Sequence, residues 1–306
     1  ESGCGKSITA RSILRIIDRP GRIVEGEILF RRRKTLDSGG TDEVIDLTKL
    51  DPNGQDMRSI RGAEIALVFQ EPMSSFSPVH TVGEQIIEAI RLHQQVSRRQ
   101  ARQKAIEMLR LVGIPLPEQR VDKLSNQLSG GLRQRAMIAM ALSCHPTLLI
   151  ADEPTTALDV TTQAQILDLM RRLQREYGMA IMLITHDLGV IAEMTDTVVV
   201  MYLGRVVEQA SVDEIFYNPK HPYTQALLRS IPRIHSNARE RLASISGAVP
   251  HPYNRPSGCP FHPRCAAFMP GVCDQQEPQL QATGEQHLVS CFLYSGVETS
   301  TTDRRE

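Results

Sequence analysis

The chain begins with the residues ESGCGKS, in which glycine, lysine and serine follow the spacing that closes a phosphate-binding loop. In the full pattern GxxxxGK[ST], glycines let successive backbone N–H groups turn toward one point, and the following helix directs its positive end at the phosphates. Gly3 and Gly5 would supply these turns. Lys6 would reach the β- and γ-phosphates of a nucleotide, and Ser7 would hold Mg²⁺.

The same loop predicts what should stand before the chain. The opening glycine of the pattern would precede Glu1, and such a loop is anchored by a strand, so we expect a fragment whose N-terminal strands are missing. Ser2 and Cys4 complete the loop and are included among the expected nucleotide contacts. On this motif alone, a chance glycine- and serine-rich start is the alternative.

Composition and charge limit the classes of function. With 306 residues, 41% of them hydrophobic, the chain can bury a full core and hold one large domain with a smaller appendage. Lysine plus arginine and aspartate plus glutamate number 35 each, so no net charge favours nucleic acid as a partner.

No apolar stretch reaches the ~18–20 residues that span a bilayer, so other subunits would do any spanning of a membrane. The start of the chain resembles no signal peptide, so we expect the protein in the cytoplasm. Because the cytoplasm is reducing, the six cysteines favour metal, cluster or packing roles over disulfides.

Apolar runs and turn residues predict an α/β fold. Strands are expected at Ile65–Phe69, Leu148–Ala151 and Ala180–Thr185, each of which is a short apolar run. A helix over about residues 162–177 connects the last two strands and is stopped by Gly178. This β-α-β order predicts parallel strands in the core sheet.

Two further regions differ from this core. Residues 72–145 carry helical patterns, including one helix that Ser97 would cap and another that would start at Ser129, and they predict a helical subdomain. From about residue 230 the chain changes character and becomes rich in proline, which argues against regular core structure. We therefore expect a nucleotide-binding domain over residues 1–230 and a small irregular C-terminal extension over residues 231–306.

Two carboxylates follow the expected strand Leu148–Ala151. Asp152 and Glu153 would lie at its C-terminal end, where ligands of open α/β sheets bind. Asp152 would accept Mg²⁺ through the water shell of the ion, and Glu153 would orient and deprotonate the water that attacks the γ-phosphate. A solvated acidic turn is the alternative for any such pair, but the phosphate-binding loop favours the catalytic interpretation.

Polar residues end two other strands, and two glycines open a helix. Gln70 follows one strand and could touch Mg²⁺ or the attacking water, and His186 follows another and could contact the γ-phosphate. Ser129, Gly130 and Gly131 begin a helix whose bare N–H groups could approach a phosphate closely. Each of these features alone is more typical of a structural role.

Together these motifs have the order and spacing of an ATP-binding cassette (ABC) ATPase, and the chain resembles that family over nearly its whole length. The most specific segments are LSGG at residues 128–131 and ADEPTTALD at residues 151–159. The resemblance implies an α/β fold with a phosphate-binding loop, a mostly parallel core sheet and a helical subdomain. It also implies a second ABC ATPase subunit. Each ATP would then lie between the Lys6 side of one domain and the Ser129 side of the other, with Asp159 crossing the interface.

Within that family the chain resembles the branch that imports peptides. The segments that carry this resemblance are FQEPMSSFSPVHTVGEQI at residues 69–86, HPYTQALL at residues 221–228 and GCPFHPRC at residues 258–265. The branch serves oligopeptides, dipeptides, glutathione or nickel. The resemblance therefore implies two separate membrane permease subunits, an extracytoplasmic solute-binding protein and a peripheral place at the cytoplasmic face of the inner membrane.

Four cysteines stand in the proline-rich extension: Cys259, Cys265, Cys273 and Cys291. Four thiolates can hold tetrahedral Zn²⁺ or an iron–sulfur cluster. Their spacing lacks the paired CxxC knuckles of most zinc modules. The resemblance to the peptide-importer ATPases favours a [4Fe–4S] cluster, and four reduced cysteines in a loop-rich tail are the alternative.

Two other classes of function stay open at this point. One is an ABC ATPase that works without a transporter, on ribosomes or DNA. Such proteins carry tandem cassettes or a long coiled coil, whereas this chain has no internal repeat and no heptads between Lys6 and Ser129. The other is a redox-sensing regulator in which the cysteines matter most and ATP hydrolysis is secondary. Co-purification with two polytopic membrane proteins would separate the transport function from both.

Overall fold

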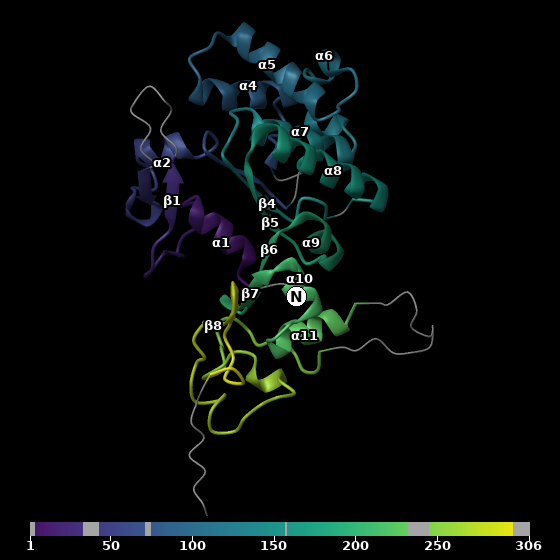
Figure 1. Ribbon diagram of the computed structural model, residues 1–306. Helices are drawn as coiled ribbons and strands as arrows, with labels where there is room; N and C mark the ends of the chain where they lie inside the picture. Colours follow the sequence, from purple (N-terminus) through teal and green to yellow (C-terminus); the bar gives the residue numbers. More distant parts are fainter. Residues whose placement is uncertain (1–3, 33–42, 71–74, 157, 232–244, 296–306) are drawn as a thin grey trace, which may run out of the picture. The chain divides into compact units, whose positions relative to one another are not determined.

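The structure is a computed structural model that describes residues 4–32, 43–70, 75–156, 158–231 and 245–295. The chain divides into two compact units. Figure 1 labels helices and strands of both. The first unit comprises residues 7–186, and the second joins residues 1–6 to residues 187–306. None of the described helices is both long and apolar enough to cross a membrane.

A parallel sheet of three strands forms the centre of the first unit. Its strands, in spatial order, are β3 (Ile65–Val68), β4 (Leu148–Asp152) and β5 (Ala180–Ile184). In β4, Leu148 pairs with Ile65 on one side and with Ala180 on the other. The last four residues of β4 are buried, which is the pattern of a strand covered on both faces. The predicted β-α-β order with parallel strands is therefore confirmed.

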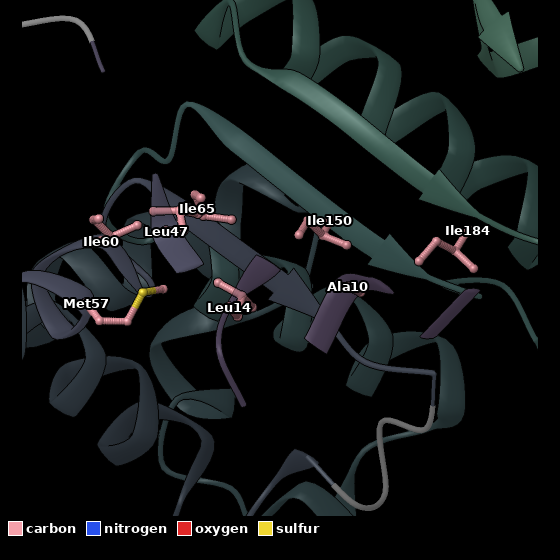
Figure 2. Close-up of a cluster of buried hydrophobic side chains, with 8 residues drawn as sticks. All are labelled: Ala10, Leu14, Leu47, Met57, Ile60, Ile65, Ile150 and Ile184. Carbon is pink, nitrogen blue, oxygen red and sulfur yellow. The ribbon is translucent and has the colours of Figure 1, made fainter. Parts of the chain in front are cut away.

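One buried cluster joins this sheet to the elements that precede it. These elements are α1 (Lys6–Ile13), the antiparallel strands β1 (Leu29–Arg32) and β2 (Glu43–Asp46), the short helix η2 (Leu47–Lys49) and α2 (Gln55–Ile60). Figure 2 shows the eight buried side chains of the cluster: Ala10, Leu14, Leu47, Met57, Ile60, Ile65, Ile150 and Ile184. Because these side chains come from α1, α2 and all three strands, the cluster holds both helices against the sheet.

Helices make up the rest of the first unit. Their bounds are α4 (Val82–His93), α5 (Arg98–Leu111), α6 (Pro117–Arg120), η3 (Ser125–Gln127), α7 (Gly130–Leu142) and α8 (Val160–Tyr177). Ser97 caps α5 as predicted, because its hydroxyl accepts from the N–H of Gln100 while Oε1 of Gln100 accepts from the N–H of Ser97. The end of α8 is also as predicted, with Gly178 in the left-handed conformation at φ 62°. Helices α4, α5 and α7 pack together, and α7 contacts β3 (Figure 1).

The second unit is built on an antiparallel sheet of four strands in the order β6–β7–β9–β8. Its elements are α9 (Leu188–Met194), β6 (Thr197–Tyr202), β7 (Arg205–Ser211), α10 (Val212–Tyr217), α11 (Pro222–Arg229), η4 (His262–Arg264), β8 (Gln281–Gly284) and β9 (His287–Val289). Strand β9 pairs with β7, with Leu288 opposite Gln209. The hairpin β8–β9 therefore extends the sheet of β6 and β7, and it packs in the same unit as these strands.

Buried polar groups reinforce this connection. Glu208 in β7 is fully buried, and its Oε1 lies 2.8 Å from Nε2 of His287 in β9. The other ring nitrogen of His287, Nδ1, lies 3.2 Å from Oε2 of Glu214 in α10. The backbone N–H groups of Lys220 and His221 donate to the two oxygens of Glu208 over 2.7 and 3.0 Å. A buried carboxylate is tolerated when it is paired in this way, so the network fixes the hairpin to β7.

Candidate active site

Side chains from three strand ends of the first unit meet at Glu153. The side-chain amide of Gln70, two residues after β3, donates from Nε2 to Oε2 of Glu153 over 2.8 Å. Nδ1 of His186, two residues after β5, lies 3.1 Å from Oε1 of Glu153. The structure thus brings together Gln70, Glu153 and His186, because the carboxyl ends of parallel strands share one edge of the sheet.

The backbone of Glu153 adopts an unusual conformation directly after β4. Its φ is 47°, in the left-handed region that residues with a Cβ rarely adopt. Such a conformation costs about 1–3 kcal/mol. The backbone N–H of Glu153 donates to the carbonyl of Ile184 in β5 over 2.8 Å, so the neighbouring strand holds the reversal in place. The Glu153 side chain is 14% exposed, which leaves its carboxylate shielded but still reachable by water.

Three oxygen-bearing side chains are the predicted ligands of Mg²⁺. Asp152, the last residue of β4, is buried at the strand end. Gln70 follows the adjacent strand β3, and Ser7 lies in the first turn of α1 in the same unit. Carboxylate, amide and hydroxyl oxygens are the ligands that Mg²⁺ prefers. The donor set therefore fits this ion.

The phosphate-binding loop is described from Cys4 onward, so the predicted contacts of Ser2 and Gly3 lie outside the described residues. Lys6 opens α1, as a lysine that reaches phosphates at a helix start would. Ser7 follows it in the same turn. The predicted order of loop, lysine and helix is therefore present in the described part.

The loop needs glycine at position 5. Gly5 has a φ of 93°, and a Cβ there would come within 3.0 Å of the Cα of Gly204 in the β6–β7 turn. The carbonyl of Cys4 accepts from the N–H of Gly204 over 2.9 Å, which keeps the two segments close. A residue with a side chain would be strained here in both backbone conformation and space.

The glycine-rich start of α7 is placed as predicted. Ser129 is the N-cap residue, its side chain accepts no hydrogen bond from the helix, and both Ser129 and Gly130 are exposed. Exposed N–H groups at the start of a helix form an anion-binding end. Gly131 serves packing, because a Cβ there would lie 2.7 Å from Cγ2 of Thr162 in α8.

Asp159 has a local partner in the structure. It caps α8, with Oδ1 accepting from the N–H of Thr162 over 2.9 Å and Oδ2 accepting from the Thr162 hydroxyl over 2.7 Å. These hydrogen bonds lower the pKa of the Asp159 carboxyl from its usual value. Its predicted place at a subunit interface stays a prediction.

Comparison with known proteins identifies the family. The model of the family described as ABC transporter matches residues 1–156 of the 306. The chain belongs to the ABC transporter family. A second family model, described as oligopeptide/dipeptide transporter, C-terminal region, matches residues 207–273 of this ABC ATPase. The family membership and the ATPase class predicted from the motifs are thereby confirmed.

Relatives match this ABC ATPase over most of their own length. A putative peptide import ATP-binding protein of Brucella ovis is 49% identical over 97% of this chain and 87% of that protein. The oligopeptide transport ATP-binding protein AppD of Bacillus subtilis is 48% identical over 98% and 88%. The dipeptide transport ATP-binding protein DppD of Haemophilus influenzae is 46% identical over 94% and 82%.

Solved structures confirm the predicted fold class. The ATP-binding cassette MJ0796, solved as a dimer in a post-hydrolysis state with ADP and Pi, aligns with a TM-score of 0.56 and 28% identity, over 69% of this chain and 82% of that one. The protein cbiO1 of Clostridium perfringens, part of the ABC transporter complex cbiONQ, aligns with a TM-score of 0.54 and 25% identity, over 71% and 77%. The ABC ATPase therefore has the predicted α/β fold with a parallel core sheet.

The four cysteines in the tail of this ABC ATPase lie in one region of the second unit. Cys259, Cys265 and Cys273 pack in the same apolar cluster, and the N–H of Cys259 donates to the carbonyl of Cys273 over 2.8 Å. Cys291 is near enough for the other three thiols to affect its titration. Within the described residues, no three His, Cys, Asp or Glu side chains are grouped closely enough to hold a metal ion.

Burial makes the thiols of Cys259, Cys265 and Cys291 poor acids. It raises the pKa of Cys259 and Cys265, and it raises that of Cys291 to about 11. A metal or cluster would therefore have to displace protons from the thiols and draw them together. Four thiols are a donor set that fits Zn²⁺ or an iron–sulfur cluster, although the described tail does not hold them preassembled.

The sequence predicted no contact between Thr156 and Glu153. Thr156 lies within the ADEPTTALD motif, and its hydroxyl donates to Oε2 of Glu153 over 2.9 Å. A threonine three residues after an acidic residue is a common turn pattern, so only the motif could have directed attention to it.

Proposed function

We propose that this ABC ATPase powers the import of peptides, or of a related small solute, through separate permease subunits. The observation that carries the proposal is that one chain matches both the ABC transporter family and the oligopeptide/dipeptide transporter C-terminal region. The relatives in Brucella, Bacillus and Haemophilus are named for peptide, oligopeptide and dipeptide transport, and they support it.

In the proposed reaction Glu153 is the general base. Its carboxylate takes a proton from the water that attacks the γ-phosphate, and ADP leaves as the phosphoryl group passes to that water. Gln70 and His186 both contact the carboxylate, so they orient it, and His186 also reaches toward the γ-phosphate. The left-handed backbone of Glu153 holds the side chain at the strand edge where these partners meet.

The phosphates are held by the loop and the start of α1. Backbone N–H groups of Ser2, Gly3, Cys4 and Gly5 cradle them, and Lys6 supplies a positive charge to the β- and γ-phosphates. Ser7, Gln70 and Asp152 would hold Mg²⁺, which when bound would offset the charge that develops on the phosphate oxygens. Binding and positioning of this kind provide most of the catalysis in phosphoryl transfer.

The site is completed by a second ABC ATPase subunit. Ser129 and Gly130 are exposed at the start of α7, and Gly131 follows them in its first turn. We propose that this helix start binds the γ-phosphate of the ATP held by the partner. Asp159 contributes from the adjacent loop across the interface. The dimeric solved structure of the similar cassette MJ0796 supports this arrangement.

The remaining partners follow from the proposed transport. We propose two integral membrane permease subunits, a peripheral place at the cytoplasmic face of the inner membrane and, indirectly, an extracytoplasmic solute-binding protein. In this assembly residues 1–230 act as the nucleotide-binding domain and residues 231–306 as the extension.

We also propose that the extension binds a [4Fe–4S] cluster, with Zn²⁺ as the alternative occupant. The ligands would be its four cysteines, Cys259, Cys265, Cys273 and Cys291. Support comes from the four thiols that lie in one region and from the match to the transporter C-terminal region, which spans the first three.

Proteoliposomes that carry the two permeases and this subunit test the proposed function. We expect uptake of labelled dipeptide or oligopeptide, driven by ATP on the side of this subunit. Lys6→Ala should abolish uptake, and Lys49→Ala, at a side chain that is 81% exposed on η2, should not. ATP hydrolysis that never drives uptake of any such solute, or full uptake with Lys6→Ala, would contradict the proposal.

A further inference from the structure

The carboxylate of Glu153, which Gln70 and His186 contact, has a third partner in the turn after β4. Oγ1 of Thr156 donates to Oε2 of Glu153 over 2.9 Å, and the backbone N–H of Thr156 donates to the carbonyl of Glu153 over 3.2 Å. A side-chain and a backbone hydrogen bond thus connect these two residues within one turn. Oε2 of Glu153 accepts from both Gln70 and Thr156, while Oε1 faces His186.

We propose that Thr156 is a positioning residue for ATP hydrolysis, whose hydroxyl holds the carboxylate of Glu153 in the orientation that receives the proton of the attacking water. The inference rests on the proposed role of Glu153 as the general base. Thr156 itself is exposed, and it acts through Glu153 rather than on ATP.

The source of the hydrogen bond distinguishes Thr156 from the other two partners. Gln70 and His186 reach Glu153 from the ends of neighbouring strands, so their contacts depend on how those segments are placed. Thr156 belongs to the same turn as Glu153, and its contact is set by the turn itself. It therefore fixes the glutamate side chain locally. Precision of this kind matters, because a displacement of ~1 Å in a reacting group can lower the rate about 100-fold.

A positioning role also predicts which kinetic constant should change. The hydroxyl of Thr156 contacts Glu153, and the proposed site holds ATP through the phosphate-binding loop, so loss of the hydroxyl should lower kcat and leave the KM for ATP nearly unchanged. A threonine with a purely structural role would not produce this separation.

Three substitutions at position 156 separate the hydroxyl from the shape of the side chain. Thr156→Val keeps the branched shape without the hydroxyl, Thr156→Ala removes both, and Thr156→Ser keeps the hydroxyl. In the assembled transporter we expect Thr156→Val and Thr156→Ala to lower kcat for ATP about tenfold, with the KM for ATP nearly unchanged. We expect Thr156→Ser to keep most of the rate. Thr161→Val, at an exposed position in the first turn of α8, is the matched control and should be fully active.

Glu153→Gln in the same assay distinguishes a failure of the proposed base, Glu153, from a failure of the positioning role of Thr156. If Glu153→Gln is inactive and a folded Thr156→Val or Thr156→Ala protein keeps the unmutated kcat, this inference is overturned and the proposed base stands. An equal loss of kcat in Thr156→Ser also overturns it, because the hydroxyl would then not be what matters. If Glu153→Gln hydrolyses ATP at the unmutated rate, both the base and its positioning residue are wrong. Should Thr156→Val fail to fold by circular dichroism, Thr156→Ala provides the same readout.

Discussion

Nδ1 of His221 accepts a hydrogen bond from the backbone N–H of Tyr223 over 3.0 Å, and the ring that accepts it is almost fully buried. His221 is the N-cap residue of α11, so its ring satisfies one of the N–H groups that a helix start leaves without a partner. Only a ring nitrogen without a proton can accept, which requires neutral histidine. Burial lowers the pKa of His221 to about 4, in agreement with this geometry.

This cap predicts a loss of stability in weak acid. Below a pH of about 6.5 the unfolded chain takes up a proton at His221, whereas the folded chain resists protonation down to a pH of about 4. The contribution of His221 to stability is therefore complete above pH ~6.5 and falls as the pH drops toward ~4, by about 3 kcal/mol in all. His221→Asn keeps a capping side chain that does not titrate, so its unfolding free energy should change less over this range.

Urea unfolding at several pH values measures the effect. The chain has no tryptophan, so far-UV circular dichroism is the appropriate signal. The unmutated protein should show the steeper decline between pH ~6.5 and ~4. The same slope in both proteins would show that His221 does not titrate as its burial indicates.

Gly131→Ala should destabilise the first unit. The added Cβ would lie 2.7 Å from Cγ2 of Thr162, and the hydroxyl of Thr162 is itself held by Asp159, so this neighbour cannot move freely. We expect a loss of about 1–3 kcal/mol of unfolding free energy. Gly130→Ala is the matched control, because its nearest neighbour, Cδ2 of Leu158, would lie 4.0 Å away. Equal stability of the two variants in urea would contradict the predicted crowding at Gly131.

The strand ends of the site could be predicted from sequence, and its finer contacts could not. Short apolar runs before Gln70, Glu153 and His186 indicate parallel strands, and the carboxyl ends of such strands share one edge. The left-handed backbone of Glu153 leaves no signal in its residue type, because glutamate rarely adopts it. The hydrogen bond from Thr156 forms within the turn that follows Glu153, and no residue pattern marks it in the sequence, so it appears only in the structure.

The pairing of β9 with β7 also could not be predicted from the sequence. Both strands of the C-terminal hairpin are short, and a proline-rich segment separates them from β7. Propensity is informative over long periodic segments and weak for short strands with distant partners. The sequence predicted an irregular extension, whereas in the structure its last two strands join a sheet. Glu208 and His287, which anchor the hairpin, carry no pattern that marks them as partners.

Ser129→Arg should abolish ATP hydrolysis in a dimer of identical subunits and leave ATP binding by the isolated monomer intact. The reason is that the exposed start of α7 would serve the ATP of the partner subunit rather than its own. A mixed dimer of one unmutated and one Ser129→Arg subunit keeps one complete composite site and should retain part of the activity. Loss of ATP binding by the Ser129→Arg monomer would argue against a site shared between subunits.

The tail should colour the protein when oxygen is excluded during purification. A [4Fe–4S] cluster would make it brown, and replacement of any one of Cys259, Cys265, Cys273 or Cys291 by serine should remove the colour. Cys144→Ser, in the first unit, is the control and should stay brown. Colourless protein with one equivalent of zinc would show that the cysteines bind a metal but that the metal is zinc rather than an iron–sulfur cluster. A metal-free tail that resists protease would rule out the site.

The ATPase rate of Glu153→Gln in the assembled transporter tests the central claim most directly. Glutamine has the same size as glutamate but cannot take a proton, so the rate should fall about 10²–10⁴-fold. The affinity for ATP should stay unchanged, because the proposed site holds the phosphates through the loop and Lys6, which this substitution leaves in place. We expect tight ATP binding with almost no hydrolysis. Hydrolysis at the unmutated rate would show that Glu153 is not the base and that the site works in another way.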